Sequence, residues 1–259
     1  MSVPVIKSDG VTKHFGGLTA VNEVEMVVPE GSISSIIGPN GAGKTTLFNC
    51  ISGFYQPEAG QIYFYDQPIV GLPTHKICEM GIARTYQNIR LFKEMTALEN
   101  VLVGEHVRLN TNWVESILHN KRFREEEDQS IARALELLDF VGLSHLVDTL
   151  ALNLPYGAQR RLEITRALAS QPALLMLDEP TAGMNPQETA EMTAFIRGLR
   201  DSRQMTILLI EHDMRVVMDI SDQITVLDHG SKIAEGKPSE IQSNQVVIDA
   251  YLGQSAKQL

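Results

Sequence analysis

The sequence is poor in cysteine, in long apolar runs and in positive charge. Cys50 and Cys78 are its two cysteines in 259 residues, which excludes a disulfide framework and favours a reducing compartment. No run of about 18 apolar residues occurs, so no membrane-spanning helix is expected, and the start MSVPVIKSDG lacks the features of a signal peptide. With 22 basic against 32 acidic residues, the net charge of −10 argues against binding to a nucleic-acid backbone. We expect an acidic, soluble, cytoplasmic protein with no nucleic-acid partner.

What is present is the composition of a globular α/β domain. Apolar residues make up 43% of the chain and charged residues 21%, values that exclude disorder, collagen and coiled coil. Strand patterns occur at 5–37 and 62–69, and the apolar runs at 173–178 and 206–211 are typical of buried parallel strands. The middle of the chain, about 90–170, has a helical pattern. This order predicts an α/β core that carries a helical insert.

Further elements are expected around these strands. In the helical middle, Ile131, Leu135 and Leu138 recur at helical spacing and are expected on one face of a helix. Cys50 follows a glycine-rich loop on a predicted helix and is expected to be a small buried hydrophobe. Toward the end of the chain we expect a helix, a hairpin that turns at His229-Gly230 and a last amphipathic helix, at 187–200, 223–236 and 239–252.

The glycine-rich loop GPNGAGKTT fits the phosphate-binding pattern G-x-x-x-x-G-K-[ST]. Glycines in such a loop turn backbone N–H groups toward phosphate oxygens, and the next helix directs its positive dipole end at the same anion. Lys44 is expected to reach the β- and γ-phosphates, and the Thr45 hydroxyl to bind Mg²⁺. The expected nucleotide triphosphate site consists of Gly38, Pro39, Asn40, Gly41, Ala42, Gly43, Lys44, Thr45 and Thr46.

Two acidic residues and a histidine follow the predicted buried strands. Asp178 and Glu179 come at the end of LLMLDE, and His212 comes directly after TILLIE. Open α/β sheets bind ligands at the carboxyl ends of their strands, so these side chains are expected beside the phosphates. Asp178 is expected to hold Mg²⁺, Glu179 to orient or deprotonate the attacking water, and His212 to contact the γ-phosphate or the water.

These motifs, in this order, resemble those of ABC transporter ATP-binding subunits over about 5–236. The resemblance implies an α/β fold, namely a P-loop NTPase core with an antiparallel β-subdomain and a helical signature subdomain. It implies one ABC ATPase domain over 1–259, with a core at 1–90 and 170–236, a helical subdomain at 91–169 and a C-terminal helical extension at 237–259. The matching motifs are Walker A at 38–45, the Q-loop glutamine Gln87, the signature region at 156–164, Walker B at 174–179, the D-loop at 182–185 and the switch histidine His212.

The resemblance also implies a role for each motif in an ATPase that uses ATP and Mg²⁺. Glu179, His212 and Gln87 are expected in hydrolysis, with Mg²⁺ held by Thr45, Gln87 and Asp178. Phe15, in KHFGG, resembles the aromatic residue that stacks on adenine, and the alternative is a core phenylalanine at a strand end. In this family two subunits enclose two ATP molecules, and each signature contacts the ATP of the other subunit. The signature residues expected to make that contact are Tyr156, Gly157, Ala158 and Gln159.

The signature departs from the usual LSGGQ. Pro155 replaces the serine whose hydroxyl would bind the γ-phosphate of the partner's ATP, and proline has no N–H donor. Gly157 and the start of the following helix are kept, so the contact is weakened rather than removed. Asn185 stands where the D-loop has aspartate. These departures predict two unequal ATP sites in a heterodimer.

The departures are similar to those of LivG-type ATPases of branched-chain amino-acid importers, as is the ending IDAYLG at 248–253. That resemblance implies two integral-membrane permease subunits, a second ATP-binding subunit (a heterodimer, with a homodimer as the alternative), a periplasmic binding protein and a peripheral location on the cytoplasmic face of the inner membrane. The alternatives are a urea or amide importer, a lipid or lipopolysaccharide exporter, a soluble ABC protein of translation or DNA repair, and a regulator without turnover.

Three segments outside these motifs have open interpretations. Residues 88–94 carry Ile89, Leu91 and Phe92, which suit docking of a membrane subunit or packing within the helical subdomain. Residues 121–128 carry both charge signs, as a solvated helix face does. Trp113 suits either a partner contact or surface packing.

Overall fold

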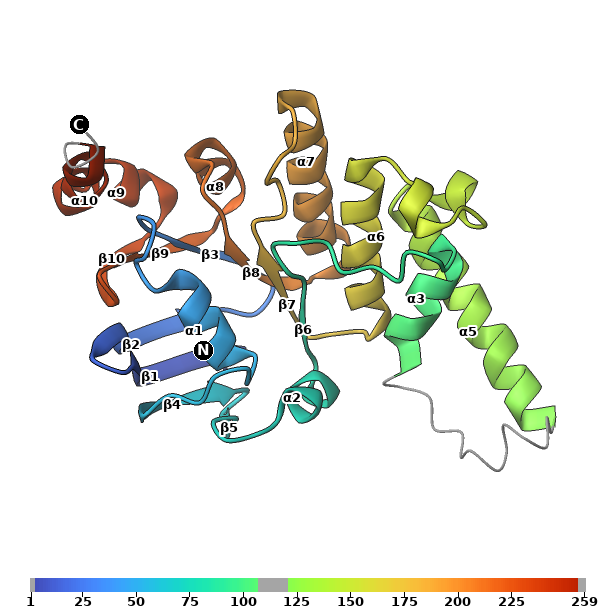
Figure 1. Cartoon of the computed structure of the whole chain (residues 1–259), viewed down its shortest axis with the longest axis horizontal. Coiled ribbons are helices and arrows are strands. Elements are labelled where there is room, and N and C mark those ends of the chain that lie inside the picture. The colour runs from blue at the N-terminus through green and yellow to red at the C-terminus, as the bar shows by residue number, and fades with distance from the viewer. Residues whose placement is uncertain (1–2, 107–120, 256–259) are drawn as a thin grey trace. The chain divides into compact units, whose positions relative to one another are not determined.

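The computed structural model describes residues 3–106 and 121–255. The chain forms two compact units: Met1–Arg84 joins Ala173–Leu259 in the first, and Thr85–Pro172 forms the second. The first unit contains both β-sheets, whereas the described part of the second is helical (Figure 1). Trp113 lies outside the described residues.

The larger sheet of the first unit has the strand order β10-β9-β3-β8-β7-β6. Its strands pair in parallel except for the antiparallel hairpin of β9 and β10. Every residue of β3, β7 and β8 is buried, as expected for strands covered on both faces, and the two apolar runs predicted as parallel strands are confirmed. The strands are β3 Ile33–Ile37, β6 Ile82–Arg84, β7 Leu174–Asp178, β8 Thr206–Ile210, β9 Gln223–Asp228 and β10 Ser231–Gly236.

The smaller sheet is antiparallel with the order β2-β1-β4-β5. The single strand predicted at 62–69 is wrong, because the chain turns at Tyr65 and Asp66, whose φ angles of 46° and 61° are left-handed. Aromatic and β-branched residues on both sides conceal this hairpin turn in the sequence. The strands are β1 Ile6–Phe15, β2 Leu18–Val28, β4 Ala59–Phe64 and β5 Gln67–Pro68.

The last helix predicted from the sequence is two helices instead. The break falls at Asn244, whose Oδ1 accepts the N–H of Val246 at 3.0 Å and so caps the second helix. The hairpin at His229-Gly230 is confirmed, since both residues have left-handed φ between β9 and β10. The helices of the first unit are α1 Lys44–Ile51, α2 Thr74–Met80, α7 Pro186–Arg203, α8 Met214–Ile220, α9 Pro238–Gln242 and α10 Gln245–Ser255.

The core of the first unit anchors the loop that precedes α1. Leu47, Phe48 and Ile51 of α1 are fully buried and belong to one apolar cluster with Ile36 of β3. Cys50 is 3% exposed in the same cluster, which confirms its prediction as a buried apolar residue. The loop 38–43 is therefore held at both ends by packed elements.

In the second unit, α3 packs against α5 and α6. The helix predicted from Ile131, Leu135 and Leu138 is confirmed as α5, in which Leu135 is 40% exposed whereas Ala134 and Leu138 are buried. Ser130 of α5 is buried as well, and its hydroxyl donates to the buried Glu105 of α3. Within 3–106 and 121–255, no helix combines the length and apolar composition that a membrane crossing requires. The helices of this unit are α3 Ala97–Glu105, α5 Lys121–Phe140, η2 Ser144–Leu146, η3 Ala151–Asn153 and α6 Tyr156–Ala169.

Candidate active site

The loop 38–43 connects β3 to α1 and depends on glycine. Gly38, Gly41 and Gly43 have φ angles of 146°, 80° and 98°. A Cβ at Gly38 would lie 2.0 Å from the backbone oxygen of Leu227, and one at Gly43 would lie 2.2 Å from that of Ala20. The loop is thus packed against β9 and β2, at distances that only glycine permits.

Lys44 is held inside this loop. Its side chain is buried, and Nζ donates to the carbonyl oxygens of Gly38 at 2.7 Å and Pro39 at 2.9 Å. Burial lowers the pKa of the Lys44 ammonium, and the nearby carboxylates of Glu179 and Asp178 act in the opposite direction. A buried ammonium bound to carbonyl dipoles beside two carboxylates is ready to bind phosphate oxygens.

Helix α1 begins at Lys44 without a side-chain cap and without an acidic residue in its first turn. The N–H groups of this turn therefore have no capping side chain, and the positive end of the helix dipole adds to their attraction for an anion. Thr45 and Thr46 follow Lys44 on this turn and line the adjacent cavity. The observed geometry fits the anion site that the glycine-rich motif predicts.

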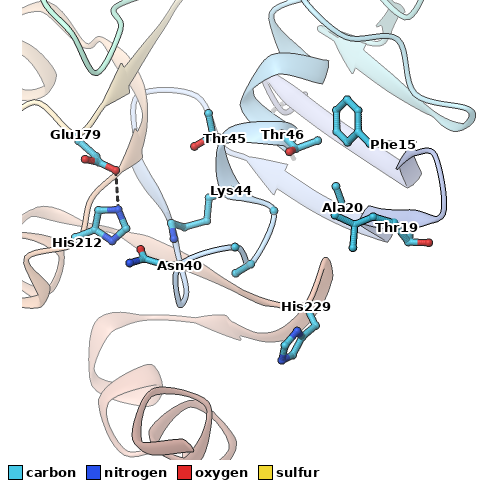
Figure 2. Close-up of a pocket in the computed structure, with 14 residues that line it drawn as sticks. Phe15, Thr19, Ala20, Asn40, Lys44, Thr45, Thr46, Glu179, His212 and His229 are labelled. Carbon is cyan, nitrogen blue, oxygen red and sulfur yellow. Dashed lines mark hydrogen bonds and ion pairs between the residues drawn. The ribbon is translucent and has the colours of Figure 1, made fainter. Parts of the chain in front are cut away.

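A cavity of about 490 Å³ opens beside this loop, a size typical of small-molecule sites. Figure 2 shows the loop and α1 between a wall that carries Phe15 and an opposite side that carries the Glu179–His212 pair. The cavity brings together ten of the predicted residues, namely Phe15, Asn40, Gly41, Ala42, Gly43, Lys44, Thr45, Thr46, Glu179 and His212.

Phe15 presents its ring to the cavity and is 43% exposed, unlike a core phenylalanine. Tyr55 supports it edge-on with ring centroids 5.1 Å apart, and Lys13 Nζ lies 5.3 Å from its centroid. These contacts hold the ring and leave 43% of the residue exposed. A flat ring at this place is suited to stacking on a nucleotide base, although its role stays a prediction.

The sequence reasoning missed four other cavity residues, Leu18, Thr19, Ala20 and His229. Leu18 pairs directly with Phe15 across the β1–β2 hairpin, and the Gly16-Gly17 dipeptide between them is a hairpin signal that could have found it. Gly230 donates its N–H to Ala42 O at 3.1 Å, which brings the β9–β10 hairpin to the loop. His229 has a weaker sequence signal than Leu18, because its place at the cavity depends on β9 lying next to β3.

Glu179 and His212 meet at the ends of two adjacent parallel strands. Glu179 follows β7, His212 follows Glu211 after β8, and Glu179 Oε1 lies 2.6 Å from His212 Nε2 (Figure 2). The backbone of Glu179 is left-handed, with φ 48°, and its N–H donates to Ile210 O at 2.9 Å. This unusual backbone turns the carboxylate toward the cavity.

Asp178 is buried one residue earlier, at the end of β7. Its Oδ2 accepts a hydrogen bond from Arg84 at 2.9 Å. Arg84 also donates to Asn49 Oδ1 at 2.7 Å and Ser52 Oγ at 3.0 Å, so it ties this carboxylate to α1. Carboxylate and hydroxyl oxygens are the ligands that Mg²⁺ prefers, so Asp178 and Thr45 fit the predicted metal by their chemistry.

The remaining predicted site residues belong to the second unit. Gln87 is exposed, and its backbone carbonyl accepts from Arg160 at 2.7 Å, as does that of Tyr86. Arg160 is fully buried in α6, where it pairs with Glu163 at 2.9 Å. The helix of the signature region therefore holds the Gln87 backbone within this unit.

The signature segment 156–159 forms the first turn of α6. Pro155 is the N-cap and offers no side-chain hydrogen bond, and Tyr156 is 43% exposed. Asn185 in the D-loop caps α7 instead, because its Oδ1 accepts from Gln187 N at 2.9 Å and Glu188 N at 3.0 Å. The substitution of aspartate by asparagine at this position thus keeps a good N-cap.

In the segment predicted for docking, Phe92 is 46% exposed, whereas Ile89 and Leu91 are half-buried. The guanidinium of Arg166 lies 5.6 Å from the Phe92 ring centroid, within the same unit. The segment therefore offers one open aromatic side chain and two partly covered aliphatic ones.

Comparisons with known proteins decide the family. The family model described as ABC transporter matches residues 21–182. The chain belongs to the ABC transporter family. A second model, branched-chain amino acid ATP-binding cassette transporter, matches residues 231–257 of this ABC subunit.

Relatives match this ABC subunit from end to end. BraF of Pseudomonas aeruginosa, a high-affinity branched-chain amino acid transport ATP-binding protein, is 50% identical over 98% of this chain and 100% of BraF. LivG of Escherichia coli, which carries the same description, is 48% identical over 98% of this chain and 100% of LivG. The crystal structure of the ADP conformation of MJ1267, an ATP-binding cassette of an ABC transporter, aligns with a TM-score of 0.84 at 33% identity, over 97% of this chain and 100% of that one.

The chain is therefore an ABC ATP-binding subunit of the LivG/BraF type. Its predicted fold class, a P-loop NTPase core with an antiparallel β-subdomain and a helical subdomain, is confirmed. Membership of the family makes it a nucleotide-binding ABC ATPase. The role of each named side chain and the exact subdomain boundaries stay predictions.

Proposed function

We propose that this chain is the ATP-binding and ATP-hydrolysing subunit that powers a high-affinity branched-chain amino-acid ABC importer. The observation that carries the proposal is the end-to-end similarity to BraF and LivG, which extends into the C-terminal segment matched by the branched-chain model. The cavity supports it, because the side chains proposed to bind phosphate, stack on the base and act in hydrolysis, Lys44, Phe15, Glu179 and His212, line one space. This C-terminal match also favours amino-acid import over lipid or lipopolysaccharide export.

In the proposed reaction, ATP lies with adenine against Phe15 and its phosphates along the loop 38–43. Lys44 and the first-turn N–H groups of α1 bind the β- and γ-phosphates. Thr45 and Asp178 would hold Mg²⁺, which would neutralise phosphate charge when bound. Arg84 orients the Asp178 carboxylate by its hydrogen bond to Oδ2.

Glu179 is the proposed general base. A water molecule attacks the γ-phosphorus in line, Glu179 accepts a proton from that water, and ADP leaves with the bridging oxygen. His212 Nε2 and Glu179 Oε1 share a hydrogen bond at 2.6 Å, which fixes the direction of the Glu179 carboxylate. When the γ-phosphate is present, His212 is close enough in the same cavity to stabilise the charge that develops on it.

The proposed assembly contains two integral-membrane permease subunits, a second ATP-binding subunit and, indirectly, a periplasmic binding protein. It places this chain on the cytoplasmic face of the inner membrane, with the segment around Phe92 as the docking site for a permease helix. Because Pro155 offers no hydroxyl to the partner's ATP, the two ATP sites of the heterodimer are unequal. Equal hydrolysis rates at the two sites, each measured with the other knocked out, would contradict this inequality.

Uptake of radiolabelled leucine, isoleucine and valine by cells lacking this chain tests the transport function. We expect uptake at low substrate concentration to be lost, and to be restored by the wild-type chain but not by Lys44→Ala. A tagged chain isolated from gently solubilised membranes should bring two permease subunits and a different ATPase with it. Unchanged uptake in the deletion strain, or recovery of soluble partners alone, would contradict the proposal.

A further inference from the structure

A buried carboxylate joins the two loops that carry Glu179 and His212. Glu211 follows β8 and is 3% exposed. Its Oε1 accepts the backbone N–H of Thr181 at 2.9 Å and also the Thr181 hydroxyl. Its Oε2 accepts the N–H of His212 at 2.9 Å and, at a longer 3.5 Å, that of Asp213.

These hydrogen bonds connect segments that are far apart in the sequence. Thr181 is two residues beyond Glu179 and separated from Glu211 by 30 positions. One Glu211 oxygen therefore binds the segment after the proposed general base, and the other binds the backbone of the switch histidine. The partners are backbone N–H groups and a hydroxyl, which together stabilise a carboxylate that burial would otherwise disfavour.

The geometry of the reacting groups depends on these two loops. Glu179 has a left-handed backbone, a conformation that persists only where the surroundings enforce it. The N–H of Glu179 to Ile210 O is a first connection between the loops, and the carboxylate of Glu211 is a second. The side-chain contact between Glu179 and His212 lies directly beside them.

We propose that Glu211 is a positioning residue, whose buried carboxylate fixes the Glu179 loop against the His212 loop so that His212 can orient the general base. This inference rests on the proposed ATPase function and adds to it a buried residue that is not among those lining the cavity. A purely structural role would give the same hydrogen bonds but would affect folding rather than the contact between Glu179 and His212.

The variant Glu211→Gln separates these two roles in the full-length chain, purified in complex with its permease subunits and second ATP-binding subunit. Gln keeps an oxygen for Thr181, but it turns an NH₂ group toward the N–H of His212, so one donor faces another. We expect single-turnover hydrolysis to fall by about 10- to 100-fold, as a misplacement near 1 Å does. The ATP dissociation constant should stay within about twofold of wild type, because the loop and Lys44 are untouched.

Two further variants serve as a control and as a second test of the role proposed for Glu211. Glu240→Gln also removes a carboxylate that accepts a backbone N–H, that of Lys237 at 2.7 Å, outside the cavity. It should hydrolyse ATP at the wild-type rate. Thr181→Val keeps the shape and backbone of its site but loses the hydroxyl bond to Glu211, so hydrolysis should fall by less than in Glu211→Gln. This variant tests the inference even if Glu211→Gln fails to fold.

A double-mutant cycle with His212→Ala decides between positioning and structure. If Glu211 acts through His212, adding Glu211→Gln to His212→Ala should lower hydrolysis by less than about twofold. An equal loss in both backgrounds, or wild-type hydrolysis by Glu211→Gln and Thr181→Val, would overturn the inference while leaving the ATPase function intact. Absence of hydrolysis by the wild-type chain in the complex isolated with its permease subunits and second ATP-binding subunit would overturn the proposed function itself.

Discussion

His212 Nε2 and Glu179 Oε1 lie 2.6 Å apart, although the two residues are separated by 33 positions in the sequence. The parallel pairing of β7 with β8 produces this contact, because Asp178 pairs with Ile210 in register and both loops then leave the same sheet edge. A histidine that is hydrogen-bonded to a carboxylate keeps a fixed ring orientation. A residue predicted to contact the γ-phosphate requires such an orientation.

Replacing His212 tests this contact. We expect His212→Ala to lower the hydrolysis rate by about 100-fold or more, since positioned acid–base groups contribute 10²–10⁴-fold, with little change in ATP affinity. Rates and nucleotide affinity are to be compared with His75→Ala, which removes an exposed histidine of α2. Wild-type hydrolysis by His212→Ala would remove His212 from the mechanism.

The close packing of the phosphate loop gives a prediction about glycine. Gly43→Ala places a Cβ 2.2 Å from Ala20 O and should abolish ATP binding. Gly16 also has a left-handed φ, 59°, but a Cβ there meets nothing within 4 Å. Gly16→Ala should therefore cost only about 1–2 kcal/mol of backbone strain. Equilibrium dialysis with ATP and thermal unfolding of both variants would check this, and normal ATP binding by Gly43→Ala would contradict it.

Much of the fold follows from short-range signals in the sequence. The buried strands Leu174–Asp178 and Thr206–Ile210 appear as apolar runs, and the glycine-rich loop marks the phosphate site between a strand and a helix. The turn at Tyr65-Asp66 was not predicted from the sequence because neither residue is glycine or proline. The exposure of Leu135 does not follow from the helical spacing, because the side of α5 that is buried depends on its packing against α3 and α6.

The predicted and the missed site residues also differ in whether short-range sequence signals specify their positions. Lys44, Glu179 and His212 follow from motifs next to strand ends, where topology limits the possible positions. Leu18 and His229 reach the cavity through hairpins of two different sheets, and their sequence neighbourhoods alone do not specify that meeting. Glu211 was missed because its role lies in which backbone N–H groups its carboxylate reaches.

Two ion pairs with i,i+3 spacing should differ strongly in their effect on stability. Arg160 and Glu163 are fully buried, whereas Lys76 and Glu79 are about half-exposed. Arg160→Met leaves the Glu163 carboxylate buried without its partner and should lower the free energy of unfolding by about 3–5 kcal/mol. Lys76→Met should change the free energy of unfolding far less, because solvent already screens this exposed pair. Similar urea midpoints for the two variants would contradict the predicted importance of burial.

The two thiols should react slowly with alkylating reagents in the folded chain. Burial raises the pKa of Cys50 to about 11 and raises that of Cys78 as well. At pH 8 the Cys50 thiolate is therefore rare, and its alkylation rate should increase about tenfold per pH unit up to its pKa. Mass-spectrometric rates in native and urea-unfolded protein would measure this. Equal rates in the two states would contradict it.

The raised pKa of Cys50 also sets the direction in which the free energy of unfolding changes with pH. The folded chain holds the Cys50 proton more tightly than the unfolded chain, in which the thiol has its ordinary pKa near 9. The stabilisation is complete below pH 9 and is lost as the pH rises toward 11. Cys50→Ala should therefore show a smaller loss of unfolding free energy over this pH range. A loss equal to that of the wild-type chain would contradict the prediction.

The most direct test of the ATPase mechanism is single-turnover hydrolysis by the wild-type chain and Glu179→Gln, measured together with ATP affinity. Gln keeps the size of the side chain and a hydrogen bond to His212 but cannot accept a proton from water. We predict an ATP dissociation constant within about twofold of wild type and a hydrolysis rate lower by about 100-fold or more. Hydrolysis at the wild-type rate by a variant that binds ATP normally would contradict the assignment of Glu179 as the general base.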